Sequence, residues 1–214
     1  VLVTGASTGI GRKVTARLAA DGYFVYAGAR KDSDLAELDA IENVDAVRLD
    51  VTNPAEIAAA VETITKAGRG LYGLVNNAGV AIIGPLVETK EEDFQWVMDV
   101  NVFGPYRVTK AFSPLIVASK GRITTISSIS GILSAPNLGV YSMSKHAIEA
   151  FGDALAGEME PHDVKVSLVE PGNYNSEITR TAGKRLGVSL PNADRSKYQE
   201  PDDVAAAVAS FLVD

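Results

Sequence analysis

A glycine-rich turn at the start of the chain most constrains how it can fold. The turn occupies residues 4–11 (TGASTGIG), between the apolar run 1–3 and a segment, 12–20, that reads as a helix. Glycine lets the backbone of such a turn approach a bound group closely, and the first turn of a helix presents N–H groups and a positive dipole. The order of strand, glycine turn and helix therefore predicts a phosphate-type anion site.

Short apolar segments alternate with longer segments of helical period along the rest of the chain. The predicted strands are 1–3, 23–29, 44–49, 71–75, 122–126 and 164–169, and the predicted helices are 9–20, 54–67, 91–112, 141–160 and 201–213. Strands that alternate with helices pack as a parallel sheet covered on both faces. We therefore expect an α/β fold, a Rossmann-type doubly wound parallel sheet, in a single domain that spans residues 1–214.

Three local signals refine the helix boundaries. Asn53 followed by Pro54 is a favourable helix start, because Asn accepts hydrogen bonds from the first free N–H groups and Pro fits the first turn. Pro105 and Pro114 lack an N–H group, so we expect the helical segment that follows Glu91 to kink or break at them.

Composition excludes several function classes. The net charge of -7 disfavours a nucleic-acid partner, because such binding rests largely on Lys and Arg. The chain has no cysteine, which excludes disulfide scaffolds, thiolate catalysis and Cys-ligated metals, and its two isolated histidines offer no metal-ligand cluster. No apolar run is long enough to span a membrane, so we expect a cytoplasmic protein.

Tyr141 and Lys145 form a candidate proton-transfer pair. Four residues apart on a predicted helix, they lie on the same face. A nearby ammonium favours the phenolate, so we expect it to lower the pKa of Tyr141 from its usual value near ~10 and make the phenol a usable acid–base group. A surface Tyr/Lys pair on an amphipathic helix would have the same spacing.

Further motifs fall in a fixed order around this pair: Asn76-Asn77-Ala78-Gly79, Asn101, Ser127-Ser128 and Pro171-Gly172. Together with the glycine turn and the Tyr/Lys pair, they make the chain resemble the short-chain dehydrogenase/reductase family over nearly its whole length. Segments 70–80 and 169–172 look most like its retinol and hydroxysteroid dehydrogenase branch. The resemblance implies hydride transfer between NAD(P)(H) and a small-molecule ketone, aldehyde or alcohol, and it places a substrate loop at about 173–200.

The resemblance also assigns roles to individual residues. The implied catalytic residues are Asn101, Ser128, Tyr141 and Lys145; the implied cofactor-binding residues are Gly5, Ser7, Ile10, Gly11, Arg30, Asp50, Val51, Asn77, Ala78, Gly79, Tyr141, Lys145, Pro171, Gly172 and Ser176. In relatives the Asn anchors a water near the Lys, and Ser176 stands where a Thr is usual. Simpler roles stay open: Ser128 and Asp50 as turn formers, and 76–79 as a brace for the central strand.

The end of the second predicted strand indicates which nicotinamide cofactor is used. NAD-binding proteins of this architecture have an acidic side chain there that accepts hydrogen bonds from the ribose 2′-OH. This chain has Ala29 instead, followed by Arg30 and Lys31. Because a guanidinium can bind a 2′-phosphate through two hydrogen bonds, we expect NADP(H) to be preferred to NAD(H). Arg30 and Lys31 could instead be solvated charges, and the nearby Asp32 and Asp34 could weaken their field.

Two readings from other classes remain. Residues 5–9 also match G-x-S-x-G, the nucleophile elbow of a serine hydrolase, with Ser7 as nucleophile and His146 or His162 as the only candidate bases. A non-catalytic dinucleotide-binding regulatory module is the second alternative, since fold does not fix function.

The resemblance extends to assembly and to the chain ends. Relatives pair subunits through the helix that carries the Tyr/Lys pair and through the segment 91–112, so we expect a homodimer or homotetramer. Relatives usually continue past the position of Asp214 into a last strand, and they have residues before the first strand. We therefore expect a trimmed version of a longer protein.

Overall fold

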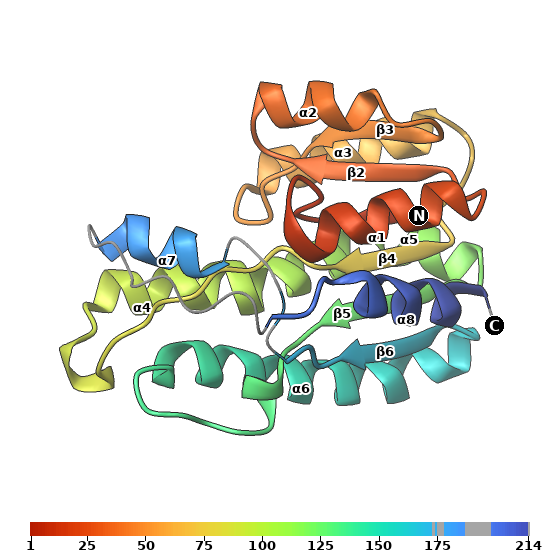
Figure 1. Cartoon of the computed structure of the whole chain (residues 1–214). Coiled ribbons are helices and arrows are strands. Elements are labelled where there is room, and N and C mark those ends of the chain that lie inside the picture. The colour runs from red at the N-terminus through yellow and green to blue at the C-terminus, as the bar shows by residue number, and fades with distance from the viewer. Residues whose placement is uncertain (173, 175–177, 187–197, 214) are drawn as a thin grey trace.

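The computed structural model describes residues 1–172, 174, 178–186 and 198–213. Its strands form one parallel sheet in the order β3-β2-β1-β4-β5-β6, which confirms the predicted doubly wound α/β fold (Figure 1). The strands are β1 (Leu2–Val3), β2 (Val25–Ala29), β3 (Val44–Arg48), β4 (Gly73–Asn76), β5 (Arg122–Ile126) and β6 (Lys165–Val169). The chain order reverses between β1 and β4, and ligands of such sheets bind at this point.

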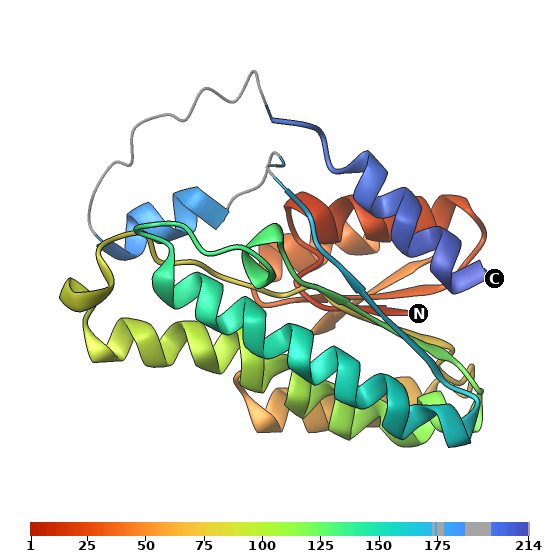
Figure 2. The same ribbon diagram turned by 90° about the horizontal axis from the view of Figure 1, so that it is seen from below.

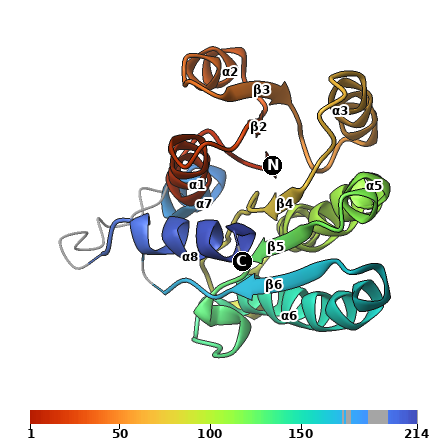
Figure 3. The same ribbon diagram turned by 90° about the vertical axis from the view of Figure 1, so that its right-hand side faces the viewer.

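Helices cover both faces of the sheet (Figure 3). They are α1 (Gly9–Ala20), α2 (Asp32–Asp39), α3 (Pro54–Lys66), α4 (Glu91–Met98), α5 (Gly104–Ala118), α6 (Gly139–Met159), α7 (Ile178–Leu186) and α8 (Asp202–Val213). Helices α1 and α8 pack on one face, and α3, α5 and α6 on the other. No helix in the described part of the chain is both long and apolar enough to cross a membrane.

The two helix layers produce two apolar cores. Successive side chains of a strand point to opposite faces, so Leu74 of β4 joins the core under α3 and α5, whereas Val75 joins the core under α1 and α8. Phe112 is fully buried in the first core and Leu18 in the second. Because both faces are covered, β1, β2, β4 and β5 are buried throughout, which explains the nearly continuous apolar sequences of β1 and β2, although β4 and β5 also bury polar side chains.

The two prolines act differently from each other: the α-helix is interrupted directly before Pro105, as the sequence predicts, but it is not broken at Pro114. The helical segment is interrupted by one π-helical turn, Asp99–Phe103, which precedes Pro105; Pro105 itself lies in the first turn of α5, where its missing N–H costs nothing. Pro114 lies inside α5 without ending it, and the helix continues to Ala118 instead of stopping at residue 112. Figure 2 shows α4 and α5 following each other beneath the sheet, beside α6.

The capping prediction at Asn53 is confirmed. Its side-chain oxygen accepts hydrogen bonds from the N–H groups of Ala55 (3.1 Å) and Glu56 (3.4 Å). The carboxylate of Glu56 in turn accepts a hydrogen bond from the N–H of Asp50 (2.7 Å). The start of α3 is thereby fixed to the turn that follows β3, which lies at the carboxyl edge of the sheet.

Candidate active site

A cavity of about 540 Å³ runs along the carboxyl ends of the strands, from the glycine turn and the end of β2 to α6 and α7. It brings together most of the predicted site residues: Gly5, Ser7, Ile10, Arg30, Asp50, Val51, Asn77, Ala78, Gly79, Ser128, Tyr141, Lys145, Pro171 and Gly172. Gly11 lies behind the turn and Asn101 behind the cavity wall, and neither lines it. Ser176 lies outside the described residues, as does much of the predicted loop 173–200.

The glycine turn needs its glycines for both conformation and space. Gly5 and Gly9 have φ angles of 64° and 56°, a region that L side chains rarely adopt. A Cβ on Gly5 would lie 2.9 Å from the Cα of Ala78, and one on Gly11 would lie 2.4 Å from the carbonyl oxygen of Gly5. The turn therefore packs directly on the loop after β4, and the N-terminus of α1 stays open to the cavity.

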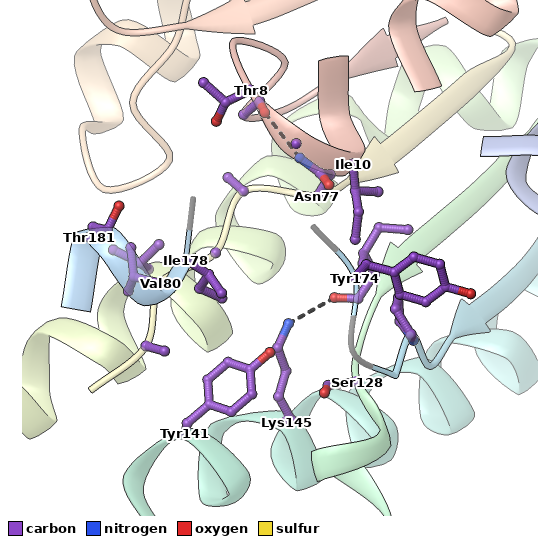
Figure 4. A pocket seen from close by; sticks show the side chains of 18 of the residues that line it. Thr8, Ile10, Asn77, Val80, Ser128, Tyr141, Lys145, Tyr174, Ile178 and Thr181 are labelled. Atoms are coloured by element: carbon purple, nitrogen blue, oxygen red, sulfur yellow. Dashed lines mark hydrogen bonds between the residues drawn. The ribbon is translucent and has the colours of Figure 1, made fainter. Parts of the chain in front are cut away.

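Asn77 fixes this arrangement. Its side-chain amide donates to the carbonyl oxygens of Thr4 (2.9 Å) and Gly5 (3.1 Å), and its backbone N–H donates to the Thr4 hydroxyl (3.0 Å). The neighbouring Asn76 donates to the hydroxyl of Thr109 (2.9 Å). The bracing role considered for 76–79 is thus present, while Asn77 also faces the cavity (Figure 4).

Tyr141 and Lys145 project from the first turns of α6 into the other end of the cavity (Figure 4). The ammonium of Lys145 lies 5.7 Å from the centroid of the Tyr141 ring and donates to the carbonyl oxygen of Ile126 (2.9 Å). Burial lowers the pKa of Lys145 to about 8, and the negative charge of Glu149 acts in the opposite direction. The cation is therefore close to neutralisation at mildly alkaline pH.

The predicted pKa direction of Tyr141 is wrong. Burial raises the pKa of Tyr141 above its usual value, and a hydrogen bond with Ser128 opposes that effect without reversing it. The expectation considered the charge of Lys145 alone, whereas removing the phenol from water disfavours the phenolate more strongly. Tyr141 is consequently a protonated phenol at neutral pH.

The structure separates the roles of the two serines after β5. The Ser127 hydroxyl donates to the carboxylate of Glu149 on α6. The Ser128 hydroxyl interacts with Tyr141 and accepts a hydrogen bond from the backbone N–H of Ser130 (3.1 Å). Ser128 therefore caps the short helix Ile129–Gly131, so the turn-forming role is present, while its chemical role stays a prediction. Of the two serines, Ser128 is the one whose hydroxyl bonds to Tyr141.

Asn101 lies in the π-helical turn and is 2% exposed. Its side-chain oxygen accepts from the N–H of Val80 (2.8 Å), and its amide donates to the carbonyl of Val80 (2.8 Å) and the hydroxyl of Ser144 (2.9 Å). The side chain thus joins the loop after β4 to the helix of Tyr141. Its role near a water stays a prediction.

Arg30 and Asp50 face each other at the far end of the cavity. The guanidinium of Arg30 lies 3.6 Å from the carboxylate of Asp50. Partial burial acts to raise the pKa of Asp50, but hydrogen bonds from Thr52 and the charge of Arg30 outweigh it, so this pKa is lowered. Arg48 donates to the carbonyl of Arg30 (2.6 Å) and pairs with Asp32, whose charge is thereby balanced.

Several cavity residues were not identified from the sequence. They are mostly apolar and include Val80, Ala81, Ile83, Ile129, Leu138, Tyr174, Ile178, Thr181 and Tyr198. Val80, Ala81 and Ile83 directly follow the recognised motif 76–79, a position that could have indicated them. Ile178 and Thr181 lie on α7, a helix that the sequence analysis did not predict, although its apolar residues Ile178, Ala182 and Leu186 recur at helical spacing.

The serine-hydrolase alternative lacks a base. Neither His146 nor His162 lines the cavity that contains Ser7. The ring of His146 instead bonds to the carbonyl of Ser142 (2.9 Å), and His162 follows the far end of α6. Within the described residues, no group of three or more His, Asp or Glu side chains is arranged to hold a metal.

Comparisons with known proteins agree with this site. The family model described as short chain dehydrogenase matches residues 1–187. Mitochondrial D-beta-hydroxybutyrate dehydrogenase of Rattus norvegicus is 37% identical over 92% of this chain and 63% of its own length. Retinol dehydrogenase 5 of Mus musculus is 38% identical over 94% and 66%, and a 3-ketodihydrosphingosine reductase of Bacteroides thetaiotaomicron is 39% identical over 84% and 65%.

Solved structures show the same architecture. A variant of actinorhodin polyketide ketoreductase with NADPH superposes with a TM-score of 0.89 at 27% identity, covering 100% of this chain and 89% of the other. An alcohol dehydrogenase from Thermococcus sibiricus with 5-hydroxy-NADP gives 0.86 at 28%, covering 99% and 88%. The chain spans about two thirds of the length of the curated relatives it matches. The glycine turn, the Tyr/Lys helix and these matches together place the chain in the short-chain dehydrogenase/reductase family.

Proposed function

We propose that the protein is an oxidoreductase that transfers a hydride between NADP(H) and a ketone or aldehyde, or the corresponding alcohol. One observation carries this proposal: Ser128, Tyr141 and Lys145 converge at one end of a single cavity whose opposite end is the glycine turn. A cofactor lying between these ends would place a reactive group beside a proton donor. A regulatory module that only binds dinucleotides would not need the Ser128–Tyr141 contact.

The residues present fit a dinucleotide. A Cβ on Gly11 would push the turn away from Asn77, so its absence preserves the close-packed cradle at the N-terminus of α1. This helix has no acidic residue in its first turn, so nothing on it repels a pyrophosphate. When bound, the nicotinamide would supply or accept the hydride, and it is oxidised when a carbonyl is reduced.

The side chains at the Tyr141 end account for the proton. In carbonyl reduction, the carbonyl carbon gains the hydride and its oxygen gains the proton of the Tyr141 phenol, which gives the alcohol. The Ser128 hydroxyl would hold that oxygen through a hydrogen bond, and the Lys145 cation would stabilise the phenolate left behind. Because its pKa is raised, Tyr141 retains its proton until an alkoxide develops.

Arg30 supports the choice of NADP(H). Its guanidinium lines the cavity at the end of β2, where an NAD enzyme of this architecture has an acid, and its side chain is 63% exposed. Asp32 pairs with Arg48, so Asp34 and Asp50 are the nearby acids that remain to weaken the field of Arg30. The NADPH and 5-hydroxy-NADP complexes among the similar structures are consistent with this choice.

The walls near Tyr141 favour a neutral apolar substrate. Val80 and Ile178 extend into the cavity (Figure 4), and Ile83, Ile129 and Leu138 also line it. Among the described residues that line this end, Lys145 carries the only charge, and it is already bonded. A ketone or aldehyde of retinoid, steroid or fatty-acyl type suits these walls better than a sugar or a short keto acid.

A screen for NADPH consumption tests the proposal. The panel pairs apolar carbonyls, such as 2-octanone, octanal and retinal, with acetoacetate and a keto sugar. We expect turnover of at least one apolar carbonyl and kcat/KM at least about tenfold lower for acetoacetate. Preference for acetoacetate would reject the substrate class alone, whereas NADPH binding without turnover of any carbonyl would favour the regulatory module.

The proposal also covers the pairing of subunits and the cellular location of the protein. A second hollow, of about 640 Å³, lies on α4, the π-helical turn and α5, and its apolar lining includes Phe94, Trp96 and Phe103. Phe103 and Tyr106 are about half exposed on this face, which is where the family pairs subunits. We expect a homodimer or homotetramer with a cytoplasmic location. A monomer at micromolar concentration in sedimentation velocity would contradict the first point, and cell fractionation would test the second.

A further inference from the structure

Glu149 is a charged residue of α6 to which the sequence analysis gave no role. It lies one helical turn after Lys145, and its carboxylate accepts a hydrogen bond from the Ser127 hydroxyl. The Lys145 ammonium donates to the carbonyl of Ile126, the preceding residue (2.9 Å). Two successive turns of α6 thus bind two successive residues at the end of β5, and the next residue along the chain is Ser128.

The carboxylate of Glu149 is enclosed on its other side by the short helix after β5. A Cβ on Gly131 would lie 2.7 Å from its Oε1 and 2.9 Å from the Ser127 hydroxyl. The absence of a side chain at Gly131 therefore leaves room for the carboxylate. This close fit holds Glu149 in one place, between the helix of Tyr141 and the turn of Ser128.

The charge of Glu149 also acts on Lys145. Burial favours the neutral amine of Lys145, and the negative charge of Glu149 opposes this effect by raising the pKa of Lys145. Other charged or titratable groups on α6 or on elements packed against it are Glu91, Glu92, Asp93, Asp99, Arg107, Tyr141, His146, Asp153, Glu158, Glu160, His162, Lys165 and the nearby Glu170.

We propose that Glu149 is a positioning residue with two functions: it holds the Ser127–Ser128 turn against α6, and it places a negative charge one helical turn from the Lys145 ammonium. This inference rests on the proposed function. Glu149 does not itself touch the reacting group, because Ser127 and Lys145 lie between its carboxylate and the cavity. Its influence therefore reaches the reaction through the location of Ser128 and the charge of Lys145.

Two substitutions separate these functions. Glu149→Gln preserves the side-chain length and an oxygen that can accept from Ser127, but removes the charge. At alkaline pH, kcat/KM for NADPH should decrease as Lys145 loses its proton. We expect Glu149→Gln to move this decrease, the alkaline fall, to lower pH by about half a unit or more, because a negative charge no longer favours the Lys145 ammonium. Ser127→Ala removes the hydrogen bond and leaves the charge. We expect it to lower kcat about fivefold or more without moving the alkaline fall.

Glu158→Gln is the matched control, because Glu158 is exposed on the same helix. The pH profile of kcat/KM for this variant should coincide with that of the wild type. A Glu149→Gln profile that also coincides with the wild type would overturn the charge function. Full kcat in Ser127→Ala would overturn the positioning function.

Gly131→Ala is the alternative variant if Glu149→Gln fails to fold, because its methyl displaces the carboxylate of Glu149. It should lower kcat and shift the alkaline fall together. An unchanged Gly131→Ala enzyme would reject the inference. A wild-type enzyme without turnover would instead reject the proposed function.

Discussion

The two ends of the cavity hold their cations in opposite environments. Lys145 is 6% exposed and donates to a backbone carbonyl, whereas the side chain of Arg30 is 63% exposed and lies 3.6 Å from Asp50. Water can replace a lost partner at an exposed site but not at a buried one. We therefore expect substitutions at the α6 end to have large effects on chemistry and stability, and substitutions at the β2 end to have smaller effects that depend on the cofactor.

Tyr141→Phe gives the largest expected effect. The substitution removes the proton donor and leaves the ring in place, so we expect kcat to fall about 10²–10⁴-fold, the usual contribution of a positioned acid or base. The affinity for NADPH, measured by fluorescence titration, should change less than about twofold. Tyr106→Phe, at a half-exposed tyrosine of α5, is the control and should retain full activity. A Tyr141→Phe enzyme with more than about a tenth of wild-type kcat would place the proton donor elsewhere.

The burial of Lys145 predicts a pH-dependent stability. Its pKa is about 8 in the fold and 10.5 ordinarily, so between these values the unfolded chain binds more protons than the native protein. Lys145 therefore increases the free energy of unfolding as pH rises through that range, by at most about 3 kcal/mol. Urea unfolding of the wild type and Lys145→Met should give a stability difference that shifts in favour of the wild type between pH 7 and pH 10. A constant difference would mean that Lys145 is not desolvated.

Gly11→Ala tests the glycine turn that lies between the two ends. The added methyl would lie 2.4 Å from the Gly5 carbonyl oxygen and from the Asn77 amide, so backbone must move. We expect a loss of about 1–3 kcal/mol in stability and weaker NADPH binding. Gly157→Ala is the control, because its methyl meets nothing within 4 Å on α6, and it should stabilise by about 0.5–1 kcal/mol. Equal effects of the two substitutions would contradict the close packing.

Much of this scaffold can be read from the sequence because its signals are local. The helix 9–20 is found at the predicted residues, and Asn53 caps α3 as its type suggests. Helix α2 was missed because it buries only Leu38 and so has no apolar period. Pro114 was misjudged because the buried side chains of Phe112 and Ile116 hold α5 in the core despite the missing hydrogen bond.

The candidate site was predicted in its composition but not in its electrostatics. Residue spacing placed Tyr141 and Lys145 on one helix face, yet their burial depends on how α6 packs against β6, α4 and the π-helical turn. Burial reversed the expected direction for the pKa of Tyr141. The role of Glu149 was equally hidden, because its partner Ser127 is 22 positions away in the chain.

Arg30→Ala should have the smallest effect, and a selective one. If the guanidinium binds a 2′-phosphate, its loss removes one charge-assisted contact, worth about 1.5–3 kcal/mol when fully formed. Because the side chain is largely exposed, we expect the lower end of this range, an increase of about tenfold in KM for NADPH. KM for NADH should hardly change, since that cofactor has no phosphate at this position.

Arg17→Ala, at an exposed arginine of α1 that pairs with Asp21, is the matched control and should change KM for neither cofactor. Equal weakening of both cofactors in Arg30→Ala would mean that Arg30 acts on the turn after β2 and not on the phosphate. A wild-type preference for NADH would show that an exposed cation at this end does not select the cofactor, which would leave specificity to the buried end of the cavity.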